Sequence, residues 1–304
     1  MIDDFVASAD ALDRVEDALR KAAAEEVMPR FRQLGADEIT QKDGPHDLVT
    51  VADQRAELHL ERNLTALLPG SVLVGEEGTH ADPGRLAALR GDAPVWIVDP
   101  VDGTRQFVRG EPGFCTLVAL AHRGEVLVSW TYLPAKDVMA VARRGGGAYV
   151  VGGEELHAGV PEPGHELHVA VSHHDFTTDA EKRALARLDV PGVRARPCGS
   201  AGHDYLSVAR GEIDAVAFSW EKPWDHAAGL LLVAEAGGAS GTVAGEPFRV
   251  AGGNALPFTA ARDAETARHI LALLAGPGRG VPGTALVDLP DRPGPARDVP
   301  PEQP

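Results

Sequence analysis

The chain has little cysteine, few aromatic residues and fewer basic than acidic side chains. Its 304 residues include two cysteines, Cys115 and Cys198, with neither metal-ligand spacing nor a disulfide framework, so we expect both to be reduced and structural. Asp and Glu number 45 against 29 Lys and Arg, and the net charge of −16 argues against nucleic acid or an anionic membrane as a partner. No apolar run approaches the roughly 20 residues of a membrane span. The start Met1-Ile2-Asp3-Asp4 lacks the basic residues of a signal peptide, so we expect a cytoplasmic protein.

The first half of the chain carries both helical and strand periodicities. Apolar residues at near-helical spacing predict a long amphipathic helix over 5–31, ended or bent by Pro29, and a second helix over 54–68. Apolar runs predict strands over 71–75, 95–98, 114–122, 125–133, 138–143 and 148–151. Gly145-Gly146-Gly147 has no following Gly-Lys-Ser/Thr and lies between two of these strands, so a hairpin turn is favoured over a phosphate loop. This half is therefore predicted to be α+β.

The second half alternates between strand and helix patterns. Strands are predicted over 168–172 and 215–218, and helices over 179–188, 203–210, 227–236 and 263–274, which is typical of an α/β layer. His173-His174-Asp175 is interpreted as a polar strand end, because hard cations rarely use imidazole. We expect one domain over 1–276, with subdomains of roughly 1–155 and 156–276. The Pro-rich segment 277–304 is predicted to be a disordered tail.

The segment 95–104 ends an apolar strand with two carboxylates, a glycine and a threonine. Residues 95–98 show no polar alternation, which is typical of a strand covered on both faces. The proline after Asp99 turns the chain, so that Asp99 and Asp102 can converge as hard oxygen ligands for a cation. Gly103 permits the close approach of an anion, to which the amides of Gly103 and Thr104 can donate if a helix starts there. Considered alone, a solvated turn explains the segment equally well.

Carboxylates recur at three other predicted element ends. Glu76 and Glu77 follow the strand over 71–75, where adjacent acids are either fully solvated or neutralised by a metal. Asp225 stands at the expected N-cap of the helix over 227–236, and Asp53 precedes the helix over 54–68, so capping alone accounts for each of these two. The four groups together predict one shared site for cations and phosphate.

These four groups resemble the inositol monophosphatase family, the magnesium-dependent, lithium-sensitive phosphatases that include fructose bisphosphatases and bisphosphate nucleotidases. The family pattern is an Asp, then Glu-Glu, then Asp-Pro-hydrophobic-Asp-Gly-Thr, then Trp-Asp. Its members here are Asp53, Glu76-Glu77, the segment 99–104 and Trp224-Asp225. The resemblance runs from residue 47 to residue 238 and, more weakly, to the first and last helices. It implies a layered αβαβα fold, a homodimer, and Mg²⁺-dependent hydrolysis of a small phosphate monoester by a metal-activated water.

The resemblance also implies a role for each residue of the pattern. One Mg²⁺ would be held by Glu76, Asp99 and the carbonyl of Val101, and a second by Asp99, Asp102 and Asp225, so that Asp99 bridges them. A third, weaker ion would rest on Glu76. Thr104 and Asp53 would hold and deprotonate the water, with Glu77 as an outer acid that orients ligands. Phosphate would meet Gly103 and Thr104, and Ser200 lies in the segment matching the family's substrate wall.

Substrate recognition departs from the inositol-selective pattern. Members selective for inositol phosphates carry a Glu seven residues before the aspartate of the Trp-Asp block. Here that position is Phe218, whose ring cannot accept hydrogen bonds from vicinal hydroxyls, although Glu221 is close enough in sequence to substitute. We therefore expect inositol 1-phosphate to be a poor substrate, while histidinol phosphate, sugar phosphates and bisphosphate nucleotides stay open.

Two further alternatives come from other functional classes. A two-metal nuclease is disfavoured by the acidic balance of the chain. A non-catalytic metal- or phosphate-binding protein would be expected to lose Thr104 and Asp53, and both are present. His226 could reach a phosphate, but a polar residue in the first turn of a helix needs no such role.

Overall fold

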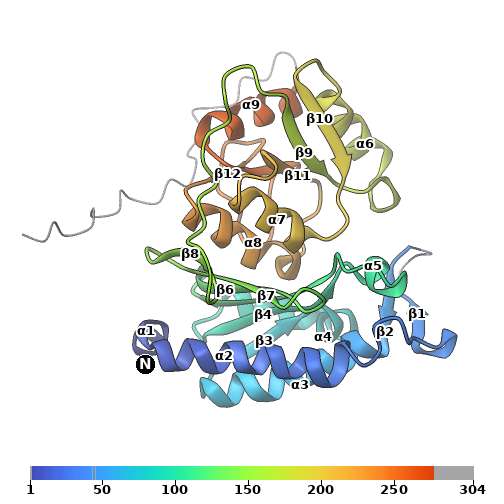
Figure 1. The fold of residues 1–304 in the computed structure, drawn as a ribbon, viewed down its shortest axis with the longest axis vertical. Coiled ribbons are helices and arrows are strands. Elements are labelled where there is room, and N and C mark those ends of the chain that lie inside the picture. Colours follow the sequence, from blue (N-terminus) through green and yellow to red (C-terminus); the bar gives the residue numbers. More distant parts are fainter. Residues whose placement is uncertain (1, 43, 45, 277–304) are drawn as a thin grey trace, which may run out of the picture.

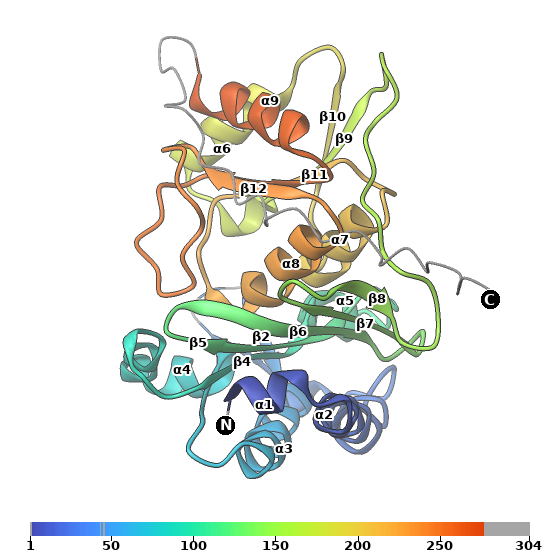
Figure 2. The same ribbon diagram turned by 90° about the vertical axis from the view of Figure 1, so that its left-hand side faces the viewer.

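The elements of the chain stack in five layers (Figure 1). The computed structural model describes residues 2–42, 44 and 46–276, so the predicted tail over 277–304 lies outside the described residues. From one face of the molecule to the other, the layers are helices, a six-stranded sheet, a pair of helices, a five-stranded sheet and further helices (Figure 2). This is the predicted αβαβα order. The two middle helices connect the halves of the chain, because they pack on both sheets.

The first helical layer holds α1 (Ile2–Ala7), α2 (Ala9–Ala22) and α3 (Val51–Leu67). The single helix predicted over 5–31 is divided, because Ser8 caps α2 and its hydroxyl accepts from the amide of Ala11 at 3.2 Å. A π-helical turn over Ala23–Val27 then ends the helix before Pro29. Leu12, Val15 and Leu19 at helical spacing pack with α3 and with the tryptophans of the first sheet.

The first sheet has the strand order β3-β4-β5-β6-β7-β8. Its strands are β3 (Val72–Gly75), β4 (Val95–Asp102), β5 (Cys115–His122), β6 (Glu125–Leu133), β7 (Val138–Arg143) and β8 (Gly147–Val150). β3 and β4 are parallel and the rest form the predicted antiparallel meander. The turn between β7 and β8 is a hairpin turn as predicted. The Glu235 carboxylate accepts from the amides of Gly145 and Gly147 at 2.6 and 2.8 Å.

The second sheet has the order β10-β9-β11-β13-β12, with β9, β10 and β11 parallel. Its strands are β9 (Leu167–Val171), β10 (Val193–Pro197), β11 (Ala215–Phe218), β12 (Ala239–Thr242) and β13 (Phe258–Ala261). The helices α7 (Ala201–Ala209) and α8 (Pro223–Glu235) lie between the two sheets, while α6 (Asp179–Leu185) and α9 (Ala264–Ala275) cover the outer face (Figure 2). A 3₁₀ turn over Ala186–Leu188 extends α6.

Short elements surround the end of β4. They are β1 (Ile39–Gln41), β2 (Leu48–Thr50), α4 (Glu76–Ala81), α5 (Thr104–Val108) and 3₁₀ turns over Ala36–Glu38, Pro83–Arg90 and His174–Phe176. Gly103 begins α5 with a φ of +90°, and a Cβ atom there would lie 2.9 Å from the Cβ of Ser200, so only glycine fits. Cys115 and Cys198 are buried and free, as predicted. None of the described helices combines the length and the apolar character that a bilayer crossing requires.

Candidate active site

The predicted acidic residues gather at the carboxyl end of β4, beside a cavity of about 330 Å³ between the two sheets. The first half of the chain contributes the end of β4 and the start of α5. The second half contributes His173, Phe176, Cys198, Gly199, Ala201, Trp220, Lys222, Trp224 and Asp225. Several predicted site residues line the cavity: Glu76, Asp99, Val101, Asp102, Gly103, Thr104 and Asp225. Residues separated by up to 149 positions therefore share one site, since Glu76 and Asp225 both reach it.

Asp99 is the most buried of the acids that line the cavity, with 2% of its surface exposed. Its Oδ1 accepts from the amide of Val101 at 3.0 Å. The strand predicted to end at residue 98 continues to Asp102, and the predicted turn is an irregular stretch of β4 where the pairing with β5 shifts register between Asp99 and Asp102. Burial, followed by the charges of Glu76, Asp102 and Asp225, raises the pKa of Asp99 well above its ordinary value. Burial and the charge of Glu76 likewise raise the pKa of Asp225. The cluster is therefore short of positive charge.

Asp102 is held by the N-terminus of α7. Its Oδ2 accepts from the Ser200 hydroxyl at 2.7 Å and from the amide of Gly202 at 2.6 Å, and its Oδ1 accepts from the amide of Ala201 at 3.2 Å. Burial raises the pKa of Asp102, while the hydrogen bonds from Ser200 and Gly202 act in the opposite direction. The structure thus places the Ser200 hydroxyl against Asp102. Ser200 is absent from the residues that line the cavity.

Glu76 and Glu77 lie in the first turn of α4 and share a lysine that sequence reasoning missed. Lys42 Nζ lies 2.7 Å from Glu76 Oε1 and 2.7 Å from Glu77 Oε1. Burial lowers the pKa of Lys42, but the charges of Glu76 and Glu77 outweigh it and raise the pKa overall. Burial and the charge of Glu76 raise the pKa of Glu77 to about 8. Glu57, also missed, accepts from the amides of Glu77 and Gly78 at 2.8 and 2.6 Å.

Thr104 contacts Asp53, although Asp53 and Glu77 are not among the residues that line the cavity. The Thr104 hydroxyl lies 3.2 Å from Asp53 Oδ1 and 3.1 Å from the carbonyl of Val101. Asp53 Oδ2 accepts from the amide and hydroxyl of Thr50, which forms a capping box at the start of α3. Burial raises the pKa of Asp53 to about 6, against the hydrogen bond from Thr50. Asp53 therefore caps a helix with one oxygen and faces Thr104 with the other.

Asp225 lies inside the first turn of α8 and is not its N-cap. The helix begins at Pro223, with Lys222 as the N-cap, four residues earlier than predicted. Proline fits this first helical position because its missing N–H would have no intrahelical partner. Asp225 Oδ2 accepts from the indole Nε1–H of Trp220.

Phe218, Glu221 and His226 do not line the cavity. Phe218 is fully buried, with its ring centroid 4.4 Å from that of Trp220. Glu221 Oε2 accepts from the backbone and side-chain amides of Asn254 at 2.8 and 2.9 Å. The geometry thus gives no support to the expected substrate contacts of Phe218 and Glu221. His226 lies 3.0 Å from the Tyr205 hydroxyl and 3.0 Å from the Trp220 carbonyl, and burial lowers its pKa to about 3.

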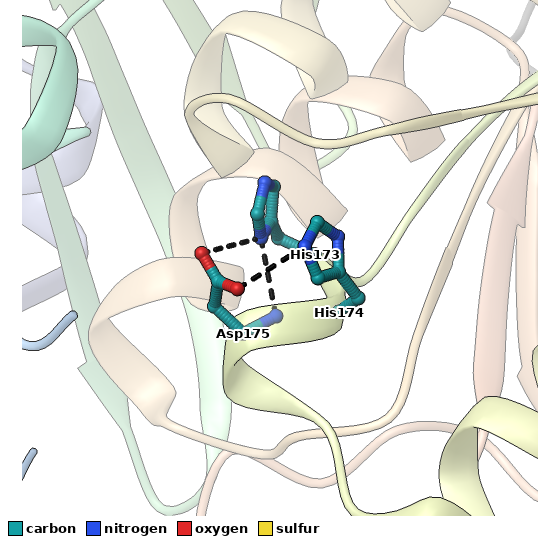
Figure 3. A group of neighbouring side chains, drawn as sticks. All are labelled: His173, His174 and Asp175. Carbon is teal, nitrogen blue, oxygen red and sulfur yellow. Dashed lines mark hydrogen bonds and ion pairs between the residues drawn. The ribbon is translucent and has the colours of Figure 1, made fainter. Parts of the chain in front are cut away.

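A second polar group, His173, His174 and Asp175, lies where β9 ends (Figure 3). One ligand atom from each residue lies within 4.8 Å of the others. The two imidazole rings stack with centroids 4.3 Å apart and an angle of 27° between their planes. Arg105 also occupies Asp175 Oδ2 at 2.7 Å. The group therefore follows the end of a strand, as predicted, and Asp175 forms an ion pair with Arg105.

The donor set at the end of β4 fits magnesium. Carboxylate and carbonyl oxygens are the ligands that Mg²⁺ prefers, and Glu76, Asp99, Val101, Asp102 and Asp225 present them around one cavity. The raised pKa values of Asp99 and Asp225 indicate that their ionised forms need additional positive charge. Lys42 provides one positive charge, and it lies on the Glu76 and Glu77 side of the site.

Known proteins share both the sequence pattern and the fold. The chain is 33% identical over 238 residues to the inositol-1-monophosphatase of Bacillus subtilis, covering 76% of this chain and 87% of that protein. It is 31% identical over 245 residues to the fructose-1,6-bisphosphatase/inositol-1-monophosphatase of Aquifex aeolicus, covering 75% and 84%. The Thermotoga maritima IMPase structure matches with a TM-score of 0.71 at 27% identity, covering 87% of this chain and 96% of that one. The model of the inositol monophosphatase family matches residues 9–274. The chain therefore belongs to the inositol monophosphatase family and is a phosphoric monoester hydrolase.

Proposed function

We propose that this phosphatase depends on Mg²⁺ and uses water as its nucleophile. The observation that carries the proposal is the acidic cluster at the end of β4, where burial and mutual repulsion raise the pKa values of Asp99 and Asp225. Ionised carboxylates in such surroundings require compensating charge. Divalent cations would supply that charge and would let an acidic protein bind an anionic substrate.

In this proposal Glu76, Asp99 and the Val101 carbonyl hold one ion, and Asp99, Asp102 and Asp225 hold a second. A third, weaker ion rests on Glu76. When bound, the ions lower the pKa of a water and offset the negative charge that develops on the phosphoryl and leaving oxygens.

The remaining residues bind phosphate and move a proton. The Thr104 hydroxyl holds the attacking water, and Asp53 Oδ1, 3.2 Å from that hydroxyl, accepts the proton. Amides of Gly103 and Thr104 donate to phosphate oxygens at the start of α5, where the first-turn amides lack intrahelical partners. Glu77 orients the ligands from the outer side, beside Lys42.

We propose a broad substrate range in which inositol 1-phosphate is not preferred. The position of the hydroxyl-binding Glu of inositol-selective members is the buried Phe218. Apart from the proposed metal ligands, Asp47 is the one carboxylate among the described residues that line the cavity. Aromatic and imidazole rings also line the cavity: His46, His173, Phe176, Trp220 and Trp224.

Phosphate release from a panel of substrates, with and without Mg²⁺, tests both parts. The panel contains inositol 1-phosphate, fructose 1,6-bisphosphate, histidinol phosphate and a bisphosphate nucleotide, with chelated protein and Asp99→Asn as controls. We expect Mg²⁺-dependent release from several substrates, with inositol 1-phosphate below at least one of them in kcat/KM. Release that is unaffected by chelation contradicts the metal part. Inositol 1-phosphate preferred by a wide margin contradicts the substrate part, and no release from any substrate favours a non-catalytic binding protein.

We also propose, on the family resemblance, that the protein is a lithium-sensitive homodimer located in the cytoplasm. Light scattering coupled to size-exclusion chromatography measures the mass of the particle. A mass of about 32 kDa, that of one chain, contradicts the dimer.

A further inference from the structure

Trp220 connects the wall of the cavity to a proposed metal ligand. It follows the end of β11 by two residues and precedes α8, and its indole Nε1–H donates to Asp225 Oδ2. Trp220 and Asp225 both line the cavity. The hydrogen bond occupies one oxygen of the carboxylate, so the rotation of the Asp225 side chain is fixed and Oδ1 is left for a cation.

The backbone of Trp220 is fixed by a second contact. The carbonyl of Trp220 can only accept, so the His226 ring nitrogen 3.0 Å away, Nε2, donates to it. In the neutral ring, Nδ1 then accepts from the hydroxyl of Tyr205, also 3.0 Å away. His226 and Tyr205 are both fully buried. Hydrogen bonds therefore link Tyr205 on α7 to His226 on α8 and His226 to the backbone of Trp220. The indole of Trp220 is in turn bonded to the proposed metal ligand, Asp225.

Packing around the chain restricts it further. The ring of Trp220 lies 4.4 Å from Phe218 and 5.2 Å from His226, centroid to centroid. Tyr205 reaches His226 because Gly229 lets α7 approach α8. A Cβ atom on Gly229 would lie 2.0 Å from the tyrosine ring. The rings and the close helix contact leave the indole little freedom to turn away from Asp225.

We propose that Trp220 is a positioning residue, anchored by His226 and Tyr205, that presents the Asp225 carboxylate to a divalent cation. This inference rests on the proposed function, because it assumes that Asp225 binds a metal ion. Mg²⁺ demands near-ideal octahedral geometry, so a carboxylate already fixed in orientation binds it more tightly than a mobile one. Hydrogen-bonding partners of metal ligands typically contribute roughly 10- to 100-fold to metal affinity.

Trp220→Phe tests the proposal because it keeps an aromatic ring and removes the N–H. The readout is the dissociation constant for Mn²⁺, a spectroscopic substitute for Mg²⁺, measured by electron paramagnetic resonance without substrate. We expect the variant to bind Mn²⁺ roughly 10- to 100-fold more weakly at its weakened site.

Trp96→Phe is the matched control. Trp96 also donates from Nε1, to the Ser71 hydroxyl at 3.0 Å, but it lies in the core between the first sheet and the helices. Trp96→Phe removes the same N–H group and the same side-chain volume as Trp220→Phe, so any loss of thermal stability common to both variants is structural. We expect Mn²⁺ affinity to stay at the wild-type value in Trp96→Phe. Equal Mn²⁺ affinity in Trp220→Phe and the wild type overturns the proposal.

Tyr205→Phe tests the anchor. Removing the hydroxyl leaves His226 Nδ1 without its donor, so the variant should also bind Mn²⁺ more weakly, by less than Trp220→Phe. The double variant should bind no more weakly than Trp220→Phe alone, because the anchor acts only through the indole. Additive losses overturn the chain of contacts. A wild-type protein that binds neither Mn²⁺ nor Mg²⁺ would overturn the proposed function itself, which separates the two failures.

Discussion

Asp99→Asn should stabilise the metal-free protein and at the same time remove its response to magnesium. Asp99 is 2% exposed and lies among Glu76, Asp102 and Asp225, all of which raise its pKa in addition to burial. Asparagine keeps the shape, removes the charge and supplies a donor to the neighbouring carboxylates. The same carboxylate is the proposed bridge between two ions, so its loss should abolish Mg²⁺-dependent turnover.

The direction of the stability change follows from the raised pKa. The folded metal-free protein binds a proton on Asp99 more tightly than the unfolded chain does. Its stability therefore falls as pH rises above the ordinary value of 3.8, and Asp99→Asn removes that fall. Stabilising substitutions are commonly worth about 0.5–2 kcal/mol, or roughly 1–8 °C in Tm for a chain of this size class. The gain should be present at pH 7.5 and absent near pH 4.

Magnesium should reverse the order of stability. A ligand at 100 times its Kd stabilises the folded state by about 2.7 kcal/mol, which exceeds the expected gain from the substitution. The wild type should therefore melt below Asp99→Asn in chelator and above it in saturating Mg²⁺. Thermal unfolding followed by circular dichroism in both buffers measures the crossing.

Asp214→Asn is a matched control with the opposite sign. Asp214 is 1% exposed, but it accepts from the amide of His168 at 2.7 Å and from Arg262 at 3.1 Å. Burial raises its pKa, but these hydrogen bonds outweigh burial and lower the pKa overall. Its replacement should destabilise the protein by about 1.5–3 kcal/mol and leave the magnesium response intact. Two results would contradict the prediction. Asp99→Asn would melt below the wild type in chelator, or Mg²⁺ would raise the Tm of Asp99→Asn as much as that of the wild type.

Three further predictions concern the proposed reaction. Thr104→Ala should lower kcat by about 10²-fold or more while Mn²⁺ affinity stays near the wild-type value, and wild-type turnover in this variant would contradict the water-holding role. The raised pKa of Asp53, about 6 against 3.8, means that its contribution to stability is fully present below pH 3.8 and is lost as pH rises through 6. Urea unfolding of the metal-free protein at a series of pH values should show this loss as a fall of about 3 kcal/mol in the free energy of unfolding. The same pH dependence in Asp53→Asn as in the wild type would count against it. Lithium at millimolar concentrations should inhibit initial rates in competition with Mg²⁺, and a rate indifferent to lithium would indicate a different cation site.

The sequence could predict the acidic residues because each of them lies at the carboxyl end of a strand or in the first turn of a helix. Apolar runs without alternation identify β3 and β4 as buried, and the parallel pairing of these strands brings both carboxyl ends to one edge of the sheet. Asp53 and Asp225 lie in the first turns of α3 and α8. Each group alone is also explained by a solvated turn or a helix cap, so one shared site could be predicted only from the four groups together and from the resemblance to the family.

Lys42 could not be predicted in the same way. Its interaction with Glu76 and Glu77 joins the loop between β1 and β2 to the start of α4, 34 and 35 positions away. Nothing in the local pattern distinguishes it from a solvated lysine.

The strands β10 and β12 were missed for a related reason. Val193–Pro197 is mostly exposed and Ala239–Thr242 contains small residues, so each is a strand only because its neighbour in the sheet pairs with it.

Strand periodicity explains why Phe218 is separated from the cavity although its sequence position indicates substrate contact. Along β11, Val216 and Phe218 face the middle helices, while Ala215 and Ala217 face the outer helical layer. The alternation therefore directs Phe218 into a core of rings, and Phe218→Glu would place a carboxylate there. Trp220, two residues beyond the strand, is free of that alternation and lines the cavity. Specificity in this chain should therefore respond to changes at Trp220, while a change at Phe218 should first be felt as a loss of stability.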